Sequence, residues 1–530
     1  MMKKQAWIIF GLSASCVSVA ALALDGSSVG ESGIDAIRLH NAPYNLIGRK
    51  IAIGQVEIGR PGLFGVDKAA NRNPTLVQVT RVFWRDNPAK TDTDVDPHAY
   101  SVAAMMISNA KAYPGVAPGA KLYSSAIGSM DKGGQPEECL ASQYLAQQNG
   151  GDLRAINFSF GESLERDPRP EAVLDGNALL TQCIDWSART HDVLYIIAGN
   201  QGRGGIPIPT DNFNGMNIAF TKRVKGIFSK VDFANIGDSA ASVVRRLAGR
   251  EINLGPRRAI GLVAPGHDIN VLNIEGTIQK VSGTSLAAPH VTATVALLQE
   301  FGDRQLRTKQ PNWSLDSRRH QVTKAVLLNS TDKLKDKGDG LFMGMGKTIS
   351  DKSNRTWLES DAYKDVKIPL DMQMGTGQLN AYRAYQQFQS GQWKPSQKVP
   401  QIGWDYDKVN ANASIDYVLD KPLQQGSYVS LTLVWNRLVD LNDANKNGQY
   451  DMGETFKDQG LNNLDLYLIP ADSNDTTTYT CASISETDST EHIFCPVPAT
   501  GRYKIRVQHR QQVNEPSQSY ALAWWTVPSK

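Results

Sequence analysis

Short, nearly continuous apolar runs that end in glycine or asparagine recur between residues 48 and 300, and they constrain the fold most strongly. They are KIAIGQVEIG (50–59), AKLYSSAIG (120–128), RAINFSFG (154–161), VLYIIAGN (193–200), MNIAF (216–220) and AIGLVAPG (259–266). Runs of this kind are typical of parallel strands that are buried on both faces. Helical patterns lie between them, including 98–112, 136–149 and 172–190. The alternation predicts a three-layer α/β domain with a mostly parallel sheet, whose active site lies where the carboxyl ends of the strands meet the following loops.

The pattern changes after residues 389–403 (QSGQWKPSQKVPQIG), which are polar, contain two prolines and predict a linker. Beyond it, alternating segments rich in β-branched and aromatic residues are separated by turn residues. They are YVSLTLVW (428–435), LDLYLI (464–469), RYKIRVQ (502–508) and YALAWW (520–525). This tail predicts an antiparallel β-sandwich. We therefore expect a short N-terminal segment (24–47), an α/β domain (48–388), a linker (389–403) and a sandwich (404–530).

The first residues predict export. Lys3 and Lys4 precede the apolar stretch AWIIFGLSASCVSVAALA (6–23), which ends in a small-x-small site. This is the pattern of a secretory signal peptide over residues 1–23, and cleavage would make the protein secreted or periplasmic and free of the membrane. An uncleaved signal anchor is the alternative, because a stretch of this length only just spans a bilayer. The segment before the first strand is too short for a folded pro-domain, so we expect none.

Charge and cysteine content exclude one function class and indicate the redox compartment. The chain has 56 Lys and Arg against 53 Asp and Glu, a net charge of +3, with no basic run long enough for a nucleic-acid footprint. Removal of residues 1–23 takes away two lysines and leaves 54 against 53, or +1. Four cysteines then remain, an even number that suggests disulfides in an exported chain. We expect Cys481 to pair with Cys495 and Cys139 with Cys183, and four free buried thiols are the alternative.

The segment VSGTSLAAPHVTATVALLQEF (281–301) contains the best candidate nucleophile, Ser285. A strand end and Gly283 lead directly into a small, apolar helical pattern, so Ser285 would stand at a helix N-terminus. Free backbone N–H groups and the helix dipole favour a developing negative charge there, as an acyl-transfer nucleophile requires. Taken alone, a serine in this setting is more often an ordinary N-cap.

A serine nucleophile needs a base, and the chain has eight histidines. His290 follows Ser285 on the same helical pattern, so we expect it to pack rather than to accept a proton. His98 opens an apolar helical pattern (VDPHAYSVAAMMIS) after an acid-rich loop, which is a better position for a base beside a cleft. Judged alone, His98 would be a capping or surface histidine.

Together these segments resemble the subtilisin-like serine proteases (subtilases). SGTSLAAPHV (282–291) is similar to the family's nucleophile motif, in which Ser285 attacks the peptide carbonyl. PHAYSVAAM (97–105) resembles its histidine motif and gives His98 the role of general base, although the residues that follow His98 depart from the usual ones. The resemblance implies a serine endopeptidase of the subtilisin fold that forms an acyl-enzyme on Ser285. It also implies protein or peptide substrates, and we expect a monomer.

Further motifs appear in the family's order over about residues 45–385. IIAGNQG (196–202) resembles the strand end that supplies the oxyanion-hole group, which falls on Asn200. INFSFG (156–161) resembles one wall of the substrate cleft, formed by Ser159, Phe160 and Gly161. Three more segments are similar to structural signatures of the family: GVAPGAKLY (115–123), VAPG (263–266) and GTGQLNAYRA (375–384).

The third member of the catalytic triad departs from the family. GRKIAIGQVEIG (48–59) aligns with the strand that ends Asp-Ser/Thr-Gly, and Glu57 falls on the aspartate. A carboxylate here fixes the tautomer of the imidazole, and glutamate reaches about 1.5 Å further than aspartate. We infer that Glu57 orients His98. The alternative orienting carboxylates are Asp67, Asp92, Asp94 and Asp96. The alternative function is a catalytically silent or impaired protein that binds peptides or surfaces.

The tail contains a candidate calcium loop, DANKNGQYDMGE (443–454), which fits the pattern D-x-[DN]-x-[DN]-G-x₅-E. Its flanks do not read as helices, so we predict a calcium-binding loop rather than an EF-hand helix pair. A solvated acidic turn is the alternative. The tail also resembles the jelly-roll-like sandwich appended to some subtilases, with this loop between two strands. The expected ligands are Asp443, Asn445, Asn447, Gln449 through its carbonyl, Asp451 and Glu454.

Overall fold

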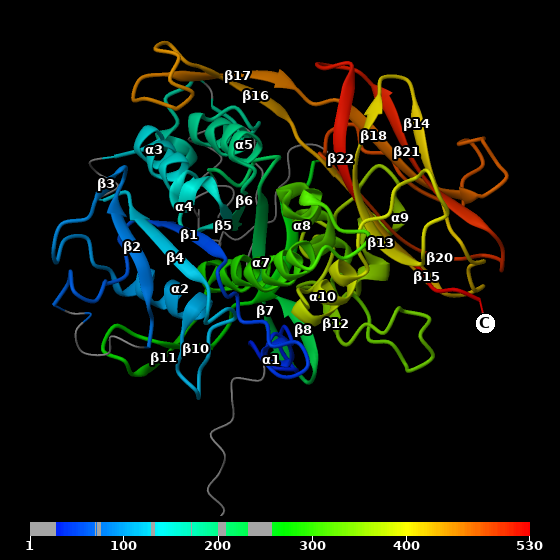
Figure 1. The fold of residues 1–530 in the computed structure, drawn as a ribbon. Helices are drawn as coiled ribbons and strands as arrows, with labels where there is room; N and C mark the ends of the chain where they lie inside the picture. The colour runs from blue at the N-terminus through cyan, green and yellow to red at the C-terminus, as the bar shows by residue number, and fades with distance from the viewer. Residues whose placement is uncertain are drawn as a thin grey trace, which may run out of the picture.

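The computed structural model describes residues 28–68, 70, 76–128, 133–170, 172–199, 208–231 and 257–529, which form an α/β domain followed by a β-sandwich (Figure 1). The predicted signal peptide (1–23) and Asn200 lie outside the described residues. Within the described ranges, no helix is long and apolar enough to cross a membrane.

The strands of the α/β domain form one mostly parallel sheet, as the sequence predicted. Its order is β12-β8-β7-β6-β5-β1-β4-β2-β3, with β9 beside β7. Only the pairs β2–β3 and β7–β8 are antiparallel in the described part of this sheet. The six apolar runs of the sequence correspond to β1, β4, β5, β6, β7 and β9. The strands are β1 (Ala52–Glu57), β2 (Val79–Trp84), β3 (Asn87–Pro88), β4 (Lys121–Ala126), β5 (Leu153–Phe158), β6 (Leu194–Ala198), β7 (Met216–Val224), β8 (Ile227–Lys230), β9 (Ile260–Pro265) and β12 (Thr348–Ser350), with a separate hairpin of β10 (Ile269–Leu272) and β11 (Ile278–Val281).

Helices cover both faces of the sheet, because successive strand residues point to opposite sides. In β1, Ile53 belongs to the core formed with α2 and α7, whereas Ala52 and Val56 belong to the core formed with α3 and α5. Figure 1 shows α7 crossing the middle of this domain. The four helices are α2 (Pro97–Ile107), α3 (Gln135–Ala146), α5 (Leu179–His191) and α7 (Thr284–Arg307). The remaining described α-helices are α1 (Ile37–His40), α4 (Gln148–Gly151), α8 (His320–Asn329), α9 (Asp361–Lys364) and α10 (Ala381–Gln389).

The N-terminal segment packs into the α/β domain. Val29, Ile34 and Leu39 are buried in the same core as α2 and α7. The Ser28 hydroxyl lies 2.7 Å from Nε2 of His290. Residues 28–47 therefore form part of the α/β domain's structure.

The C-terminal domain is an antiparallel β-sandwich, which confirms the prediction. Its two sheets have the orders β13-β22-β15-β20 and β14-β21-β18-β19. The predicted linker is tied to the sandwich, since Val399 pairs with Leu419. The strands are β13 (Ile402–Asn410), β14 (Ser414–Val418), β15 (Tyr428–Trp435), β18 (Asn463–Pro470), β19 (Cys481–Ser483), β20 (Thr490–Pro496), β21 (Tyr503–Gln511) and β22 (Ser517–Trp525).

The contacts of the sandwich with the α/β domain include those made by β15 and by a hairpin. The hydroxyls of Ser430 and Thr432 donate to Oδ1 of Asn329 on α8, at 2.9 and 3.0 Å. A hairpin of β16 (Leu438–Asn442) and β17 (Thr455–Gly460) extends from the sandwich over α3 and α5 (Figure 1).

Disulfides join Cys139 to Cys183, linking α3 with α5, and Cys481 to Cys495, so both predicted pairings are confirmed.

Candidate active site

Several predicted site residues lie at the carboxyl edge of the parallel sheet. Glu57 is the last residue of β1, and Ser159 directly follows β5. In the parallel pairing of these strands, Val56 lies opposite Phe158. Glu57 and the predicted cleft wall, Ser159 to Gly161, therefore start from the same edge, where ligands bind in open α/β sheets.

His98 and Glu57 contact each other at this edge. Nδ1 of His98 lies 3.3 Å from Oε2 of Glu57. The Glu57 side chain is 2% exposed and that of His98 is 46% exposed. The Glu57 carboxylate raises the pKa of His98 from 6.5 to about 9, against the lowering effect of burial. The other carboxylate oxygen of Glu57 is buried and has no hydrogen-bond partner in the described part of the chain.

The start of α2 fixes the position of His98. The Asp96 carboxylate caps the helix by accepting from the Ala99 N–H at 2.8 Å, and Pro97 occupies the first helical position. The Arg60 N–H donates to the carbonyl of Asp94, and the Asp96 N–H donates to that of Arg60. These bonds tie the chain after β1 to the chain before α2.

Gly59 allows this close approach of the two segments. A Cβ atom at Gly59 would lie 2.3 Å from that of Asp96 and 2.8 Å from the carbonyl oxygen of Asp94. Any larger residue at position 59 would therefore push the start of α2 away from Glu57.

Three of the four other acids proposed as orienting groups, Asp67, Asp92 and Asp96, have partners elsewhere. The Arg60 guanidinium donates two hydrogen bonds to the Asp67 carboxylate, with N–O distances of 2.6 and 2.8 Å, and both side chains are fully buried. Asp92 accepts from the Lys68 N–H, and Asp96 caps α2. His98 forms its ion pair with Glu57. Arg60 is a structural residue that sequence reasoning missed; its signal was a basic residue directly after the buried strand and before Asp67.

Ser285 is in the first turn of α7 and is 5% exposed. Its surroundings come from three strand ends. The Thr284 hydroxyl donates to the Gly199 carbonyl after β6 at 2.7 Å, and the Ser159 hydroxyl donates to the Ser285 carbonyl at 3.2 Å. The Gly283 N–H donates to the Gly266 carbonyl after β9 at 2.8 Å. The start of α7 is thereby fixed beside the cleft wall and beside the residue that precedes Asn200.

His290 packs in the interior, as the sequence predicted. It is fully buried, with Nδ1 2.7 Å from the carbonyl oxygen of Leu286 and Nε2 at the Ser28 hydroxyl. Both ring nitrogens therefore have partners away from any substrate.

The loop 443–454 is folded around its first carboxylate. Asp443 accepts from the backbone N–H groups of Lys446, Asn447 and Gly448. Gly448 has φ of +75° with open space where a Cβ would stand, which suits the sharp bend of such loops. The flanks are the strands β16 and β17 rather than helices.

Side chains within this loop bond to one another and to its backbone. The side-chain amides of Asn445 and Asn447 donate to the same oxygen of Asp451, at 2.6 and 2.7 Å. The Glu454 carboxylate accepts from the N–H groups of Ala444 and Asp451, so it closes the loop. No three His, Cys, Asp or Glu side chains gather closely enough to hold a metal ion within the described residues. The donor set fits calcium, a hard cation, through its mixture of carboxylate, amide and carbonyl oxygens.

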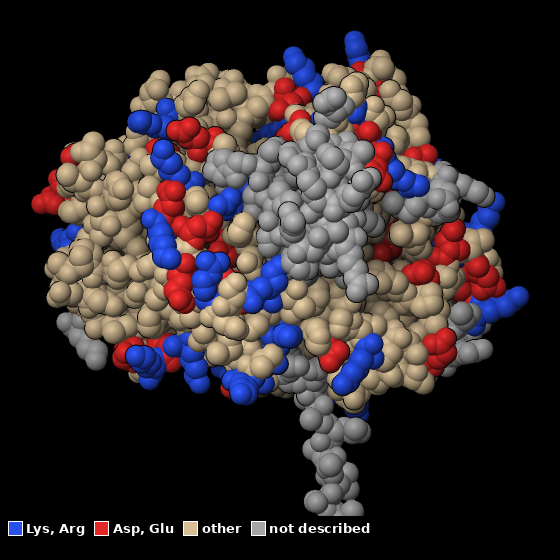
Figure 2. Space-filling model, turned by 180° about the vertical axis from the view of Figure 1, so that it is seen from behind, with Lys and Arg blue, Asp and Glu red and all other residues tan. Residues whose placement is uncertain are grey.

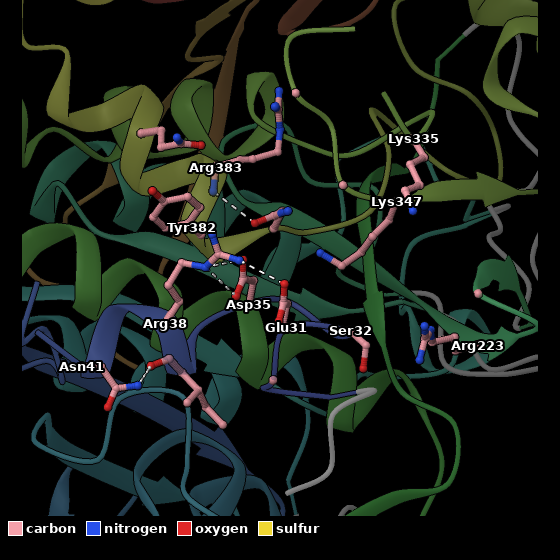
Figure 3. Close-up of a pocket in the computed structure, with 17 residues that line it drawn as sticks. Glu31, Ser32, Asp35, Arg38, Asn41, Arg223, Lys335, Lys347, Tyr382 and Arg383 are labelled. Atoms are coloured by element: carbon pink, nitrogen blue, oxygen red, sulfur yellow. Dashed lines mark hydrogen bonds and ion pairs between the residues drawn. The ribbon is translucent and has the colours of Figure 1, made fainter. Parts of the chain in front are cut away.

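A separate cavity of about 910 Å³ lies between the N-terminal segment, the β7–β8 turn and α10 (Figure 3). Arg38 on its wall pairs with Glu31 and Asp35. None of Glu57, His98 and Ser285 lines this cavity.

Figure 2 shows basic and acidic side chains intermixed on the far face of the molecule.

Comparison with known proteins gives the family. The sequence model described as "Subtilase family" matches residues 65–346, and that of the "Bacterial pre-peptidase C-terminal domain" matches residues 426–509. The first match includes His98 and Ser285 and begins after Glu57.

Individual relatives are distant. Subtilisin Savinase of Lederbergia lenta is 26% identical over 308 residues, which cover 57% of this chain and 93% of that protein. The alkaline protease of Alkalihalobacillus alcalophilus is also 26% identical over 308 residues, covering 57% of this chain and 66% of that protein. A crystal structure of MycP1 with the N-terminal propeptide removed is 14% identical with a TM-score of 0.40, covering 67% of this chain and 96% of that one. Because the family match covers more than half of the 530 residues, the chain belongs to the subtilase family and carries a β-rich domain at its C-terminal end.

Proposed function

We propose that this subtilase is an exported serine endopeptidase in which Ser285 is the nucleophile, His98 the general base and Glu57 the orienting carboxylate. The contact between Nδ1 of His98 and Glu57 carries the proposal. A carboxylate at Nδ1 holds the proton on that nitrogen and leaves Nε2 to accept one from a nucleophile.

In this mechanism the Ser285 hydroxyl oxygen attacks the peptide carbonyl carbon while Nε2 of His98 takes its proton. The leaving amine takes that proton from His98 as the peptide C–N bond breaks, and an acyl-enzyme remains on Ser285. Water then attacks the acyl carbon and gives a proton to His98. The ester C–O bond breaks as His98 returns this proton to the Ser285 oxygen, and the acid is released. Asn200 is the proposed donor to the oxyanion, which is supported by the tie between Gly199 and Thr284. The walls Ser159, Phe160 and Gly161 would hold the substrate chain.

Calcium is the proposed cofactor. Asp443, Asn445, Asn447, Asp451 and Glu454 would hold it through side-chain oxygens and Gln449 through its carbonyl, and the ion would supply cross-linking of the loop rather than chemistry. The sequence pattern of the loop supports this assignment, as do the bonds that link Asn445 and Asn447 to Asp451. Titration calorimetry with Ca²⁺ should show one site that is lost on Asp443→Ala, and unchanged binding would contradict the assignment.

Secretion or release into a periplasm is supported by the N-terminal pattern and by two disulfides, which persist in oxidising compartments. N-terminal sequencing of the exported protein tests it, with cleavage expected near residue 23.

The decisive test of activity is labelling with a fluorophosphonate probe in the presence of calcium. The probe forms a covalent bond with an activated serine, so wild-type protein should be labelled and Ser285→Ala should not. Absence of Ser285-dependent label would overturn the enzyme assignment and favour a silent peptide-binding or surface-binding protein.

A further inference from the structure

The candidate calcium loop belongs to the sandwich, yet it contacts a helix of the α/β domain. The Gln143 side chain on α3 bonds both backbone groups of Tyr450: its amide donates to the Tyr450 carbonyl, and its carbonyl oxygen accepts from the Tyr450 N–H at 2.7 Å. Gln143 is 2% exposed and Tyr450 is fully buried. Tyr450 stands between Gln449 and Asp451 in the sequence, so two proposed calcium ligands flank it.

Apolar packing surrounds this pair of hydrogen bonds. Tyr450 stacks on Phe456 with ring centroids 5.5 Å apart, and Phe456 contacts Trp186 of α5. The same cluster contains the disulfide between Cys139 and Cys183. Beyond the cluster, the Arg189 guanidinium donates to the Val439 carbonyl at 2.9 Å. The β16–β17 hairpin therefore packs against α3 and α5, the two helices that the disulfide joins.

The other end of α3 reaches the substrate cleft. The helix begins at Gln135, whose backbone N–H donates to the carboxylate of Glu162, the residue after the cleft wall. Further along α3, Ala141 and Leu145 pack in one core with Val56 of β1 and Phe160 of the wall. One rigid element therefore contacts the calcium loop, the strand that ends in Glu57, and the wall of the cleft.

We propose that Gln143 is a positioning residue that couples calcium in the loop 443–454 to the substrate cleft through α3. The inference rests on the proposed protease function for its kinetic part only. Calcium bound to Gln449 and Asp451 would fix the backbone on both sides of Tyr450, and its removal would leave this backbone held by hydrogen bonds alone. Gln143 then loses its two fixed partners, and α3 is held less firmly against the cleft wall.

Coupling of this kind is reciprocal, so an occupied cleft should also tighten calcium binding. Couplings between sites in proteins are typically about 5-fold to 150-fold in affinity. We expect calcium to lower KM for a peptide by at least about fivefold with a smaller effect on kcat, because α3 contacts the wall and not the nucleophile.

The test uses hydrogen exchange measured by mass spectrometry on the full chain in the Ser285→Ala background, with and without Ca²⁺. Calcium should protect the hairpin 438–460, α3 and residues 159–162. In Gln143→Met, which keeps the length of the side chain but removes both hydrogen bonds, calcium should protect the hairpin alone. Gln148→Met is the matched control, because Gln148 bonds only within its own helical region, to the Tyr144 carbonyl; it should behave like the parent.

The outcomes separate the two proposals. Calcium protection of the hairpin without any change in α3 or residues 159–162 in the parent would overturn the coupling, as would undiminished protection of α3 in Gln143→Met. Absence of calcium binding by calorimetry would overturn it as well. If Gln143→Met does not fold, Gln143→Glu replaces it, because this variant keeps the acceptor for the Tyr450 N–H and loses the donor. In Gln143→Glu, calcium should protect α3 and residues 159–162 less than in the parent. Failure of Ser285 to label would remove the protease function while leaving the exchange result fully readable.

Discussion

Nδ1 of His98 lies 3.3 Å from Oε2 of Glu57, so a glutamate occupies the place at the end of the strand where the family resemblance predicts an aspartate. The longer side chain meets the imidazole because Gly59 and the bonds between Arg60 and the chain before α2 set the spacing of the two segments. The distance between strand and helix therefore decides which acid has the length to orient the histidine.

Replacement of Glu57 should therefore impair catalysis in two graded steps. Glu57→Gln removes the charge and allows the wrong tautomer, so kcat should fall by about 10³- to 10⁴-fold. Glu57→Asp keeps the charge but withdraws the carboxylate by about 1.5 Å, and it should cost about a hundredfold. Steady-state kinetics on a chromogenic peptide checks both, and wild-type kcat in Glu57→Gln would show that another group orients His98.

The pH dependence of activity should reflect the contact between His98 and Glu57. The Glu57 carboxylate raises the pKa of His98 to about 9, and His98 must be neutral to act as a base. Activity as kcat/KM should therefore rise with pH up to about 9. In Glu57→Gln, the pH at which kcat/KM reaches half of its maximum should move down towards 6.5, the ordinary pKa of histidine. A wild-type profile that is already half-maximal near pH 6.5 would contradict the contact.

The raised pKa of His98 also makes the stability of the fold depend on pH. Because the folded-state pKa of His98 is raised, the pair stabilises the fold fully below pH 6.5, and this contribution is lost as pH rises towards 9. The pH of greatest activity and the pH of greatest stabilisation by this pair should therefore differ.

The sequence predicted six strands of the α/β domain because buried parallel strands are continuous apolar runs. It did not predict the short or partly exposed strands β2, β3, β8 and β10 to β12. The run 50–59 contains β1 (Ala52–Glu57), and 193–200 contains β6 (Leu194–Ala198). Helix bounds were less accurate. The pattern 172–190 predicted a helix that begins only at Leu179, because the preceding turn is held by the Asp211 carboxylate, which accepts from the Gly176 N–H.

Tertiary partners could not be read from the sequence. From the sequence, Asp67, Asp92, Asp94 and Asp96 are all alternatives to Glu57, since nothing local distinguishes one carboxylate in the loop from another. Their assignment depends on contacts made only in the fold, such as the ion pair of Asp67 with Arg60. The contact of the candidate calcium loop with Gln143 joins residues 307 positions apart, which no local pattern encodes.

The two disulfides should contribute unequally to stability. Cys139 and Cys183 are 44 residues apart, and Cys481 and Cys495 are 14 apart. In the chain-entropy view these loops correspond to about 4 and about 3 kcal/mol. The double variant Cys139→Ser/Cys183→Ser should therefore lower the free energy of unfolding more than Cys481→Ser/Cys495→Ser, as measured by urea denaturation. The opposite order would show that local strain, rather than loop length, dominates.

The buried ion pair between Arg60 and Asp67 should be required for both stability and activity. Arg60→Met leaves the Asp67 carboxylate buried without its counter-charge, which should cost about 3–5 kcal/mol in the free energy of unfolding. The nearby pair of Lys68 and Asp92 is the matched control: its atoms are 3.8 Å apart and the Lys68 side chain is 89% exposed, so Lys68→Met should change stability by less than about 0.5 kcal/mol. Because Arg60 also bonds the chain before α2 through its backbone and the Lys90 carbonyl through its guanidinium, Arg60→Met should lower kcat at temperatures where the protein remains folded. Urea denaturation and kinetics on the same preparations check this, and equal effects of the two variants would mean that the buried pair does not hold His98 in place.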